Sequence, residues 1–174
     1  MLTFNARKIN TFNIPKNNNK ESQVSLVKLN EYNIFDKLAL YHAKKSWGED
    51  NYVHGIYYDF SKHRLNKYKD RDYFAITSQK YNTTFLNPFK LLGFAELSGK
   101  DSVLPYLDYI QVNPKHKFKN QNRKFKHVGQ TLIKYITDNV IKSKIYLNAD
   151  PNAVEFYLKQ GFRTLPDNIM IYMK

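Results

Sequence analysis

The stretch from Lys124 to Leu132 constrains the fold of this chain more than any other segment. It follows a strand-like run, Leu104 to Val112, which ends at the turn signal Asn113-Pro114. It leads into an amphipathic helix that is expected to begin near His127. The apolar residues of this helix recur every fourth position and share one face: Val128, Leu132, Ile136 and Val140. A strand, a basic loop and a helix are therefore predicted in succession.

A helix that begins after such a loop offers a binding site for an anion. The first N–H groups of a helix have no intrahelical partner, and they lie at the positive end of the helix dipole. Gly129 lies in the first turn, where a missing Cβ would let a phosphate approach the backbone. We therefore expect a phosphate-bearing ligand at this turn, with Lys124 and Lys126 beside it.

The segment from Asn152 to Phe162 carries a second motif. Together the two stretches resemble the GNAT superfamily of acetyl-CoA-dependent N-acetyltransferases, and the resemblance extends over roughly residues 91–174. The first stretch is similar to that family's pyrophosphate loop from Lys124 to Gly129, but His127 stands where the first glycine is usual. The second is similar to the family's Asn-Ala-x-x-Phe-Tyr-x-x-x-Gly-Phe signature, which it matches at Asn152, Ala153, Phe156, Tyr157, Gly161 and Phe162.

The resemblance implies acetyl-CoA as the co-substrate and no metal. It also implies that the strand before the loop splays from its neighbour, so that the backbone amides of Ile110, Gln111 and Val112 pair with the pantetheine arm. The other residues that the resemblance assigns to the cofactor are Lys124, Phe125, Lys126, His127, Val128, Gly129, Gln130, Asn152 and Phe156.

Acetyl transfer to an amine needs a proton acceptor for the amine and a proton donor for the departing thiolate. The resemblance implies that Tyr157 is this donor, although it could instead be a core tyrosine. A phenol of pKa ~10 can stabilise a thiolate of pKa ~8.5 by hydrogen bonding before the proton is fully transferred. Asp108, expected on the same strand face as Ile110 and Val112, and Glu96 on the preceding strand are the candidate bases, directly or through a water. Either carboxylate could instead be structural.

The whole pattern predicts a mixed α/β fold of the GNAT type, in which a mostly antiparallel sheet, splayed at the cofactor strand, is flanked by about four helices. Residues 21–174 are interpreted as one domain that follows a polar, basic segment, residues 1–20. The expected strands are Ser22–Leu29 as the first, then Asp72–Thr77, Leu91–Leu97, Leu104–Val112, Ile145–Leu147 parallel to its predecessor, and Ile169–Met173 closing the sheet.

The expected helices have recognisable ends. Asn33 caps the first and Gly48 ends it, while Asp150-Pro151 begins the last and Gly161 ends it. Between the first helix and the sheet, Glu49–Lys69 is expected to be a second helix, or a helix and a loop, broken near Gly55. The resemblance implies that its aromatic rings line the acceptor site, although each ring alone is more simply a core residue: Tyr52, Tyr57, Tyr58 and Phe60.

Composition narrows the class of protein. The 174 residues contain no cysteine, which excludes a disulfide framework, a thiolate metal site and a cysteine nucleophile. The histidines show no ligand spacing, so a metal site is not expected. The first residues lack the apolar run of a signal peptide, and no stretch approaches the ~20 apolar residues of a membrane span. A cytoplasmic protein without a membrane partner, either a monomer or a homodimer, is expected.

The net charge of +13, from 28 Lys and Arg against 15 Asp and Glu, indicates an anionic partner unless it only reflects codon usage. Lys115–Lys126 is the most basic loop, and it could clamp the 3′-phosphate of CoA, dock an anionic macromolecule or be merely solvated. The favoured function is an N-acetyltransferase that acts on a small-molecule or peptide amine by direct attack in a ternary complex. The alternatives are a nucleic-acid-binding or tRNA-directed protein, and a non-catalytic module that binds an acyl-CoA.

Overall fold

An eight-stranded sheet runs through the part of the chain that the computed structural model describes, namely residues 7–16, 20–48, 52–62, 70–79, 86–99, 101–116 and 124–174. The strands lie in the order β1-β2-β3-β4-β5-β6-β8-β7. Their bounds are β1 (Arg7–Pro15), β2 (Glu21–Lys28), β3 (Arg71–Thr77), β4 (Leu91–Ser98), β5 (Tyr106–Val112), β6 (Lys144–Asn148), β7 (Arg163–Thr164) and β8 (Ile169–Met173). The α-helices in these ranges are α1 (Ile34–Ser46), α2 (Val53–Ser61), α3 (Val128–Tyr135) and α4 (Val154–Leu158).

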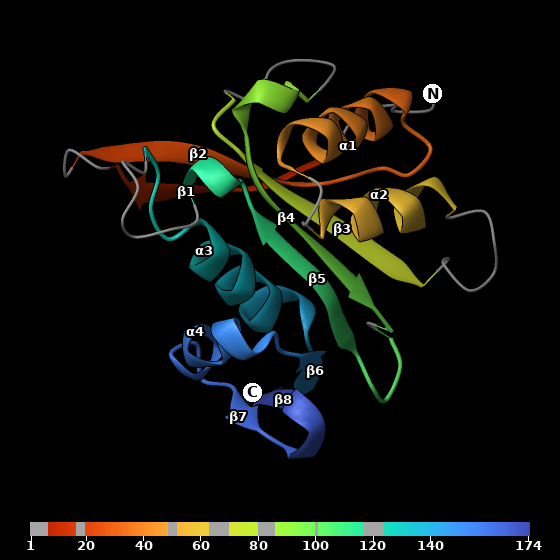
Figure 1. The fold of residues 1–174 in the computed structure, drawn as a ribbon, viewed down its shortest axis with the longest axis vertical. Coiled ribbons are helices and arrows are strands. Elements are labelled where there is room, and N and C mark those ends of the chain that lie inside the picture. The colour runs from red at the N-terminus through yellow and green to blue at the C-terminus, as the bar shows by residue number, and fades with distance from the viewer. Residues whose placement is uncertain are drawn as a thin grey trace.

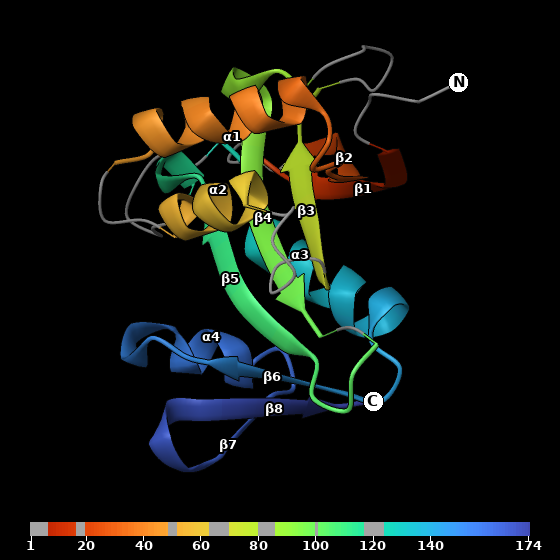
Figure 2. The ribbon, with the colours of Figure 1, turned by 90° about the vertical axis from the view of Figure 1, so that its right-hand side faces the viewer.

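Helices cover both faces of the sheet, with α1 and α2 on one face and α3 on the other (Figure 2). Helix α4 lies beside α3 (Figure 1). Alternate residues of the central strands supply two separate cores, because successive side chains of a strand point to opposite faces. Tyr73 and Phe94 pack with α2, whereas Phe74 and Ala95 pack with α3. The predicted mixed sheet with helices on both faces is therefore confirmed.

The strand pairing is antiparallel throughout the described sheet except between β5 and β6. Tyr106 of β5 pairs with Tyr146 of β6 in the parallel sense, across the connection that contains α3. A parallel pair needs such a crossover, and the predicted parallel strand at Ile145–Leu147 is confirmed.

The prediction that Ser22–Leu29 is the first strand is wrong, because β1 precedes it and pairs with it along its whole length. The sheet therefore begins within the segment 1–20, at Arg7. Asn10, beside the register shift between Lys8 and Asn10, interrupts the apolar alternation of β1 and hid the strand from pattern analysis. An edge strand tolerates such a residue, and also Pro15, since only one of its edges is paired.

The opposite edge also differs from expectation. The last strand, β8, was predicted to close the sheet, but the two-residue strand β7 lies outside it and pairs through Thr164 with Met170. A strand this short carries no periodicity that a sequence pattern can reveal.

Helix α2 runs unbroken through Gly55, so the predicted break there is wrong. The glycine is needed for contact rather than for a turn. A Cβ at Gly55 would lie 2.7 Å from Cζ of Tyr109 on β5. Helix α2 can therefore approach the sheet closely at this point.

The predicted helix ends are confirmed. The Asn33 side chain accepts a hydrogen bond from the N–H of Phe35 at 2.9 Å, and Asp150 Oδ1 accepts one from the N–H of Asn152 at 2.8 Å. Gly161 has a φ of +89°, and the following N–H, of Phe162, donates to the carbonyl of Tyr157 at 3.1 Å. This left-handed glycine ends the turn that carries Tyr157.

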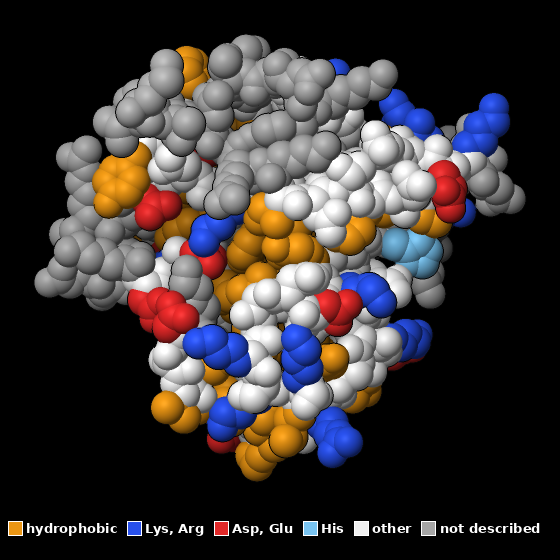
Figure 3. All heavy atoms as spheres, turned by 180° about the vertical axis from the view of Figure 1, so that it is seen from behind, with side chains coloured by type: hydrophobic (Ala, Val, Ile, Leu, Met, Phe, Trp, Pro, Cys, Tyr) orange, Lys and Arg blue, Asp and Glu red, His pale blue; other side chains and the backbone are white. Residues whose placement is uncertain are grey.

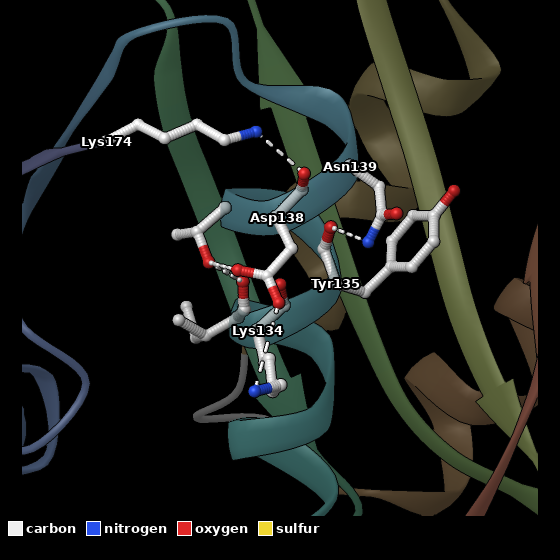
Figure 4. A network of polar contacts seen from close by, with 7 residues as sticks. Lys134, Tyr135, Asp138, Asn139 and Lys174 are labelled. Atoms are coloured by element: carbon white, nitrogen blue, oxygen red, sulfur yellow. Dashed lines mark hydrogen bonds and ion pairs between the residues drawn. The ribbon is translucent and has the colours of Figure 1, made fainter.

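The helix that begins at α3 ends in a π-helical turn, Ile136–Val140, whose carbonyls are capped from the last residue of the chain. Lys174 Nζ donates to the carbonyl oxygen of Asp138 at 2.7 Å (Figure 4). Asn139 Nδ2 donates to the carbonyl oxygen of Tyr135 at 3.1 Å. A cation at a helix C-terminus interacts favourably with the negative end of the helix dipole, so the ammonium of Lys174 stabilises the end of this helix.

Candidate active site

Strands β5 and β6 diverge. Their parallel register consists of the one pair Tyr106–Tyr146, after which β5 continues to Val112 with β4 on its other edge. The N–H of Asn113 donates to the carbonyl of Leu92 at 2.8 Å. Because amides alternate between the two edges of a strand, the amides of Ile110 and Val112 point away from β4, into the opening. The predicted splay is therefore present, and it offers backbone groups to an extended ligand.

The backbone amide of Gln111 does not point into the opening, unlike the amides of Ile110 and Val112. By the same alternation its amide points to β4, and its side chain is buried. Gln111 Nε2 donates to the carbonyl of Val112 at 2.8 Å, and Oε1 accepts from the N–H of Tyr52 at 3.4 Å. The Gln111 side chain thus ties the turn before α2 to the splayed strand.

A β-bulge on β5 changes the face that Asp108 occupies. Glu96 pairs with Tyr109 but Leu97 pairs with Leu107, so Asp108 is an extra residue in the register. Ile110 and Val112 pack against the core on the α3 side, whereas the Asp108 carboxylate lies 3.6 Å from Arg71, which also binds Asp59 of α2. The expectation that Asp108 shares a face with Ile110 and Val112 is therefore wrong, because a bulge inserts one residue into the alternation.

The loop before α3 is anchored to the end of β1. Phe125 is buried and forms a β-bridge with Lys16, and the N–H of Lys126 donates to the carbonyl of Pro15 at 2.8 Å. Lys124 is exposed, with its Nζ 5.8 Å from the centroid of the Phe125 ring. Residues 117–123 of the basic loop lie outside the described residues. The strand that the sequence did not reveal therefore positions the proposed phosphate loop.

His127 precedes the helix in a left-handed conformation, with a φ of 60°. Positive φ favours glycine, which accounts for the glycine usual at this place in the resembled loop. The first helical hydrogen bond runs from the N–H of Thr131 to the carbonyl of His127 at 2.9 Å. The N–H groups of Val128, Gly129 and Gln130 therefore precede the hydrogen-bonded helix, as an anion site requires.

The side chains of His127 and Gln130 contact each other, with 2.7 Å between Nδ1 and Oε1. Both face a groove of about 340 Å³ between β1 and the outer side of α3. The groove is lined by Phe12, Asn13, Ile14, Pro15, His127, Gln130, Thr131 and Lys134. The sequence could not predict this groove, since one of its walls is the unexpected strand β1.

Gly129 allows close packing at the start of α3. A Cβ at this position would lie 3.3 Å from Phe156 Cζ on α4 and 3.3 Å from Val112 Cγ2 on β5. The missing Cβ therefore faces Phe156 and Val112, and access of a phosphate to the backbone at Gly129 stays a prediction. Glycine here lets the start of α3 lie against both the splayed strand and α4.

Gly129→Ala is accordingly expected to lower the free energy of unfolding by about 1–3 kcal/mol, because an extra methyl overpacks a close contact. Urea denaturation measures the change. Adding Phe156→Leu should restore part of the loss, since Phe156 is one of the two side chains that the methyl meets. The same loss with and without Phe156→Leu would contradict this packing role.

Tyr157 is buried on α4 and packs edge-on against two aromatic rings, at 5.1 Å from Phe156 and 5.6 Å from Phe162. Burial raises its pKa above the ordinary value, and the nearby Tyr52 and Asp150 raise it further. Tyr52 is exposed, and its ring lies 5.8 Å from that of Tyr109 on β5. Tyr52 and Tyr157 thus approach the splay from the α2 side and from α4.

Among the other aromatics of the second helix, Phe60 is a core residue, while Tyr58 is half exposed. Asn152 is also exposed, and its Nδ2 donates to Asp150 Oδ1 at 3.1 Å, so its side chain helps to begin the turn before α4.

Three carboxylates share one guanidinium on the α2 side of the sheet, and we call this group the carboxylate cluster: Asp59, Glu96 and Asp108 around Arg71. Arg71 Nη1 lies 2.9 Å from Asp59 Oδ2 and 3.6 Å from Asp108 Oδ2, and it also binds Glu96 Oε1. Glu96 is fully buried, and burial raises its pKa from 4.5 to about 9 against the opposing effect of Arg71. Burial also raises the pKa of Asp108.

The sequence proposed two members of this cluster, Glu96 and Asp108, but not Asp59 or Arg71. The latter two lie at the ends of α2 and β3, where charged residues are common and carry no distinctive signal.

On the side of the molecule opposite to that of Figure 1, hydrophobic side chains gather in the middle of the surface, with acidic and basic side chains beside them (Figure 3).

Two further expectations concern metal binding and membrane-spanning helices. Among the described residues, no group of three or more histidine, aspartate or glutamate side chains is arranged to hold a metal ion. Metal-free chemistry stays a prediction. None of the described helices has the length and apolarity that crossing a membrane requires.

Comparison with known proteins identifies the fold. No family model and no curated protein sequence matches this chain. A GNAT-family protein from Desulfovibrio desulfuricans aligns with 87% of this chain and 98% of its own, at 13% identity and a TM-score of 0.59. AtaTR, crystallised with acetyl-CoA, aligns over 86% of this chain and 92% of its own, at 14% identity and a TM-score of 0.55.

The spermidine/spermine N-acetyltransferase SpeG from Vibrio cholerae aligns over 86% of this chain and 92% of its own, at 18% identity and a TM-score of 0.50. The chain therefore has the fold of the GNAT acetyltransferases.

Proposed function

We propose that this chain transfers an acetyl group from acetyl-CoA to the primary amine of a small molecule or a peptide, by direct attack in a ternary complex. The observation that carries the proposal is the divergence of β5 from β6, with the start of α3 lying against Val112 of β5 and against Phe156, which precedes Tyr157. This arrangement combines open backbone amides, a helix N-terminus and a protonated phenol in one place. The acetyl-CoA bound to a protein of the same fold, AtaTR, is consistent with this assignment.

The chain's own groups fit a ligand that has an amide-bearing arm and phosphates. The amides of Ile110 and Val112 suit the arm, and either of them could stabilise the oxyanion that develops during transfer. The N–H groups of residues 128–130 and the ammonium of Lys124 suit the phosphates. When bound, acetyl-CoA supplies a thioester and a thiolate leaving group.

Tyr157 is proposed to donate to the departing sulfur. Its raised pKa keeps the phenol protonated at neutral pH, so that it is always available as a donor. The same rise makes complete proton transfer to a thiolate of pKa ~8.5 less favourable. The main contribution of Tyr157 is therefore a hydrogen bond that strengthens as charge develops on sulfur.

Asp108 is the proposed proton acceptor for the amine. Its side chain is 20% exposed, whereas Glu96 is fully buried and, with a pKa of about 9, holds a proton at neutral pH. A base must be unprotonated and within reach of the substrate. Burial raises the pKa of Asp108, which makes it a stronger base than an ordinary aspartate.

The test has two parts. Acetyl-CoA at 100 times its Kd should stabilise the folded protein by about 2.7 kcal/mol, seen as a rise in Tm, because a ligand that binds only the folded state shifts the equilibrium. Release of free CoA in the presence of a primary amine should then report turnover. An unchanged Tm at millimolar acetyl-CoA would contradict the proposal. A shift in Tm without turnover on any amine would favour the non-catalytic acyl-CoA-binding alternative.

A further inference from the structure

Strand β1 is an edge strand of the sheet, and the segment that leads into α3 lies beside its outer edge (Figure 1). An edge strand exposes N–H and carbonyl groups that another extended chain can bind. The hydrogen bond from the N–H of Lys126 to the carbonyl of Pro15 shows which groups of β1 point outward. Because the direction of these groups alternates along a strand, the N–H and carbonyl groups of Thr11 and Asn13 point outward as well.

Both ends of this outer edge are occupied by the chain itself. At one end Phe125 forms an antiparallel bridge with Lys16, as a residue of an added strand would. The chain then turns away from the edge at His127, which has a φ of 60°. At the other end the N–H of Thr11 donates to Oδ1 of Asn10 at 2.7 Å. The open part of the edge therefore lies between these two ends.

Three backbone groups point outward in this open part: the carbonyl of Thr11, and the N–H and the carbonyl of Asn13. The described part of the chain offers them no hydrogen-bond partner. An added strand would satisfy all three with two N–H groups and one carbonyl. Main-chain pairing of this kind supplies affinity for an extended peptide, and pockets for alternate side chains supply specificity.

The groove between β1 and α3 would accept the side chains of such a strand. Phe12 and Ile14, which pack on the α3 side of the sheet, lie on its β1 wall. Gln130, Thr131 and Lys134 lie on its α3 wall. Because successive side chains of a strand point to opposite faces, every second side chain of an added strand would point into the groove.

The charges around the groove favour an acidic segment. The side chain of Lys134 is 75% exposed, and its Nζ lies 3.9 Å from the carboxylate of Asp138. Such an exposed ion pair is weak, so Lys134 can bind a second carboxylate. Lys16 and Lys124 add two cations near one end of the groove, where each Nζ lies 5.8 Å from the centroid of the Phe125 ring. A second copy of this chain is a poorer occupant, because each copy has a net charge of +13.

We propose that the outer edge of β1 binds an extended, acidic peptide segment of another protein as an added strand. The backbone of this segment pairs with Thr11 and Asn13, and its carboxylates lie near Lys134. This interaction goes beyond the proposed acetyl transfer and does not depend on it.

The test uses two fluorescein-labelled peptides of seven residues, in which valine alternates with either glutamate or lysine. In fluorescence anisotropy the glutamate peptide should bind at least about 10-fold more tightly than the lysine peptide, because only its charge complements the groove. This preference should shrink at high salt, since ions screen exposed charges. Equal binding of the two peptides, or binding of neither, would overturn the inference.

Methylation of every backbone nitrogen of the glutamate peptide tests the backbone pairing without changing the protein. The methylated peptide keeps its charge but cannot donate to the carbonyls of Thr11 and Asn13, so it should bind at least about 10-fold more weakly. Equal binding of the methylated peptide would show that charge alone holds it, and would overturn the inference.

Asn13→Pro removes the outward N–H from the protein side and should weaken binding of the unmodified glutamate peptide in the same way. Pro15 already occupies an equivalent outward position, so β1 can accommodate this change, and thermal unfolding checks that it does. A dimer in sedimentation that Asn13→Pro dissociates would assign the edge to a second copy of the chain and overturn the inference.

Lys134→Glu and Lys142→Glu form a matched pair that locates the site. The two lysine side chains are 75% and 82% exposed, and their Nζ atoms lie 3.9 Å and 3.8 Å from single carboxylates, those of Asp138 and Asp101. Lys134→Glu should weaken binding of the glutamate peptide by about 3- to 10-fold, as expected for an exposed charge contact that is reversed. Lys142 does not line the groove, and Lys142→Glu should change binding by less than about 2-fold. Equal effects of the two variants would mean unspecific attraction and overturn the inference.

Discussion

Replacing Tyr157 with phenylalanine is expected to lower kcat by about 10²–10⁴-fold, the usual contribution of a positioned acid or base. The change removes only the hydroxyl and keeps the ring that packs against Phe156 and Phe162. The rise in Tm caused by acetyl-CoA should therefore be nearly the same in Tyr157→Phe and in the wild type. Steady-state release of CoA and thermal unfolding measure the two quantities.

Tyr172→Phe is a suitable control, because Tyr172 packs against Phe162 at 5.5 Å from the outer side of the same aromatic group. It removes a phenol from that group without touching the proposed donor, and kcat should change little. Unaltered turnover in Tyr157→Phe would mean that Tyr157 is a packing residue and that water protonates the thiolate. A loss of the acetyl-CoA effect on Tm would mean instead that the hydroxyl contributes to binding.

Local signals in the sequence predicted the ends of helices well. Asn33 and Asp150 cap their helices because a short side-chain oxygen reaches the N–H two residues later, and this depends on neighbouring residues alone. Gly161 ends its turn because it can adopt a positive φ. Periodicity similarly located the central strands, whose two faces belong to different cores.

Features that depend on distant residues escaped prediction. The bulge at Asp108 arises from its register against Glu96 and Leu97, and no pattern within β5 reveals it. The carboxylate cluster combines α2, β3, β4 and β5, so Arg71 and Asp59 acquire their role only in the folded chain. Gly55 suggests a helix breaker, because the sequence does not show why a glycine is needed there. The reason is its close contact with Tyr109, which exists only in the folded chain.

Replacing Arg71 with methionine is expected to lower the free energy of unfolding by about 3–5 kcal/mol at neutral pH, because the largely buried carboxylates of Asp59 and Asp108 lose the cation that compensates them. The loss should depend on pH, and its sign follows from Glu96. Its pKa is 4.5 ordinarily and about 9 in the folded protein, so between these values the folded state holds more protons than the unfolded state. Stability must then fall as pH rises from about 4.5 to about 9.

Without Arg71, which lowers the pKa of Glu96 and of Asp108, both carboxylates should hold their protons more strongly. Glu96 should therefore ionise near pH 9 in the wild type and only at a higher pH in Arg71→Met, so the difference in stability between the two proteins should grow as the pH rises past about 9. The titratable and charged groups that face one another here are Asp59, Arg71, Tyr73, Glu96, Tyr106, Asp108 and Tyr109. Urea denaturation across this pH range measures the effect without adding salt.

Glu96→Gln supplies the decisive comparison, because it keeps the shape of the side chain and removes its charge. The double variant Arg71→Met, Glu96→Gln should be more stable than Arg71→Met alone at pH 8–9, near the pKa of Glu96. It should also show a weaker dependence on pH, since the most buried carboxylate no longer needs a counter-ion. A loss in Arg71→Met that is equal below and above pH 9, and unaffected by Glu96→Gln, would show that Arg71 stabilises the fold by packing rather than by charge.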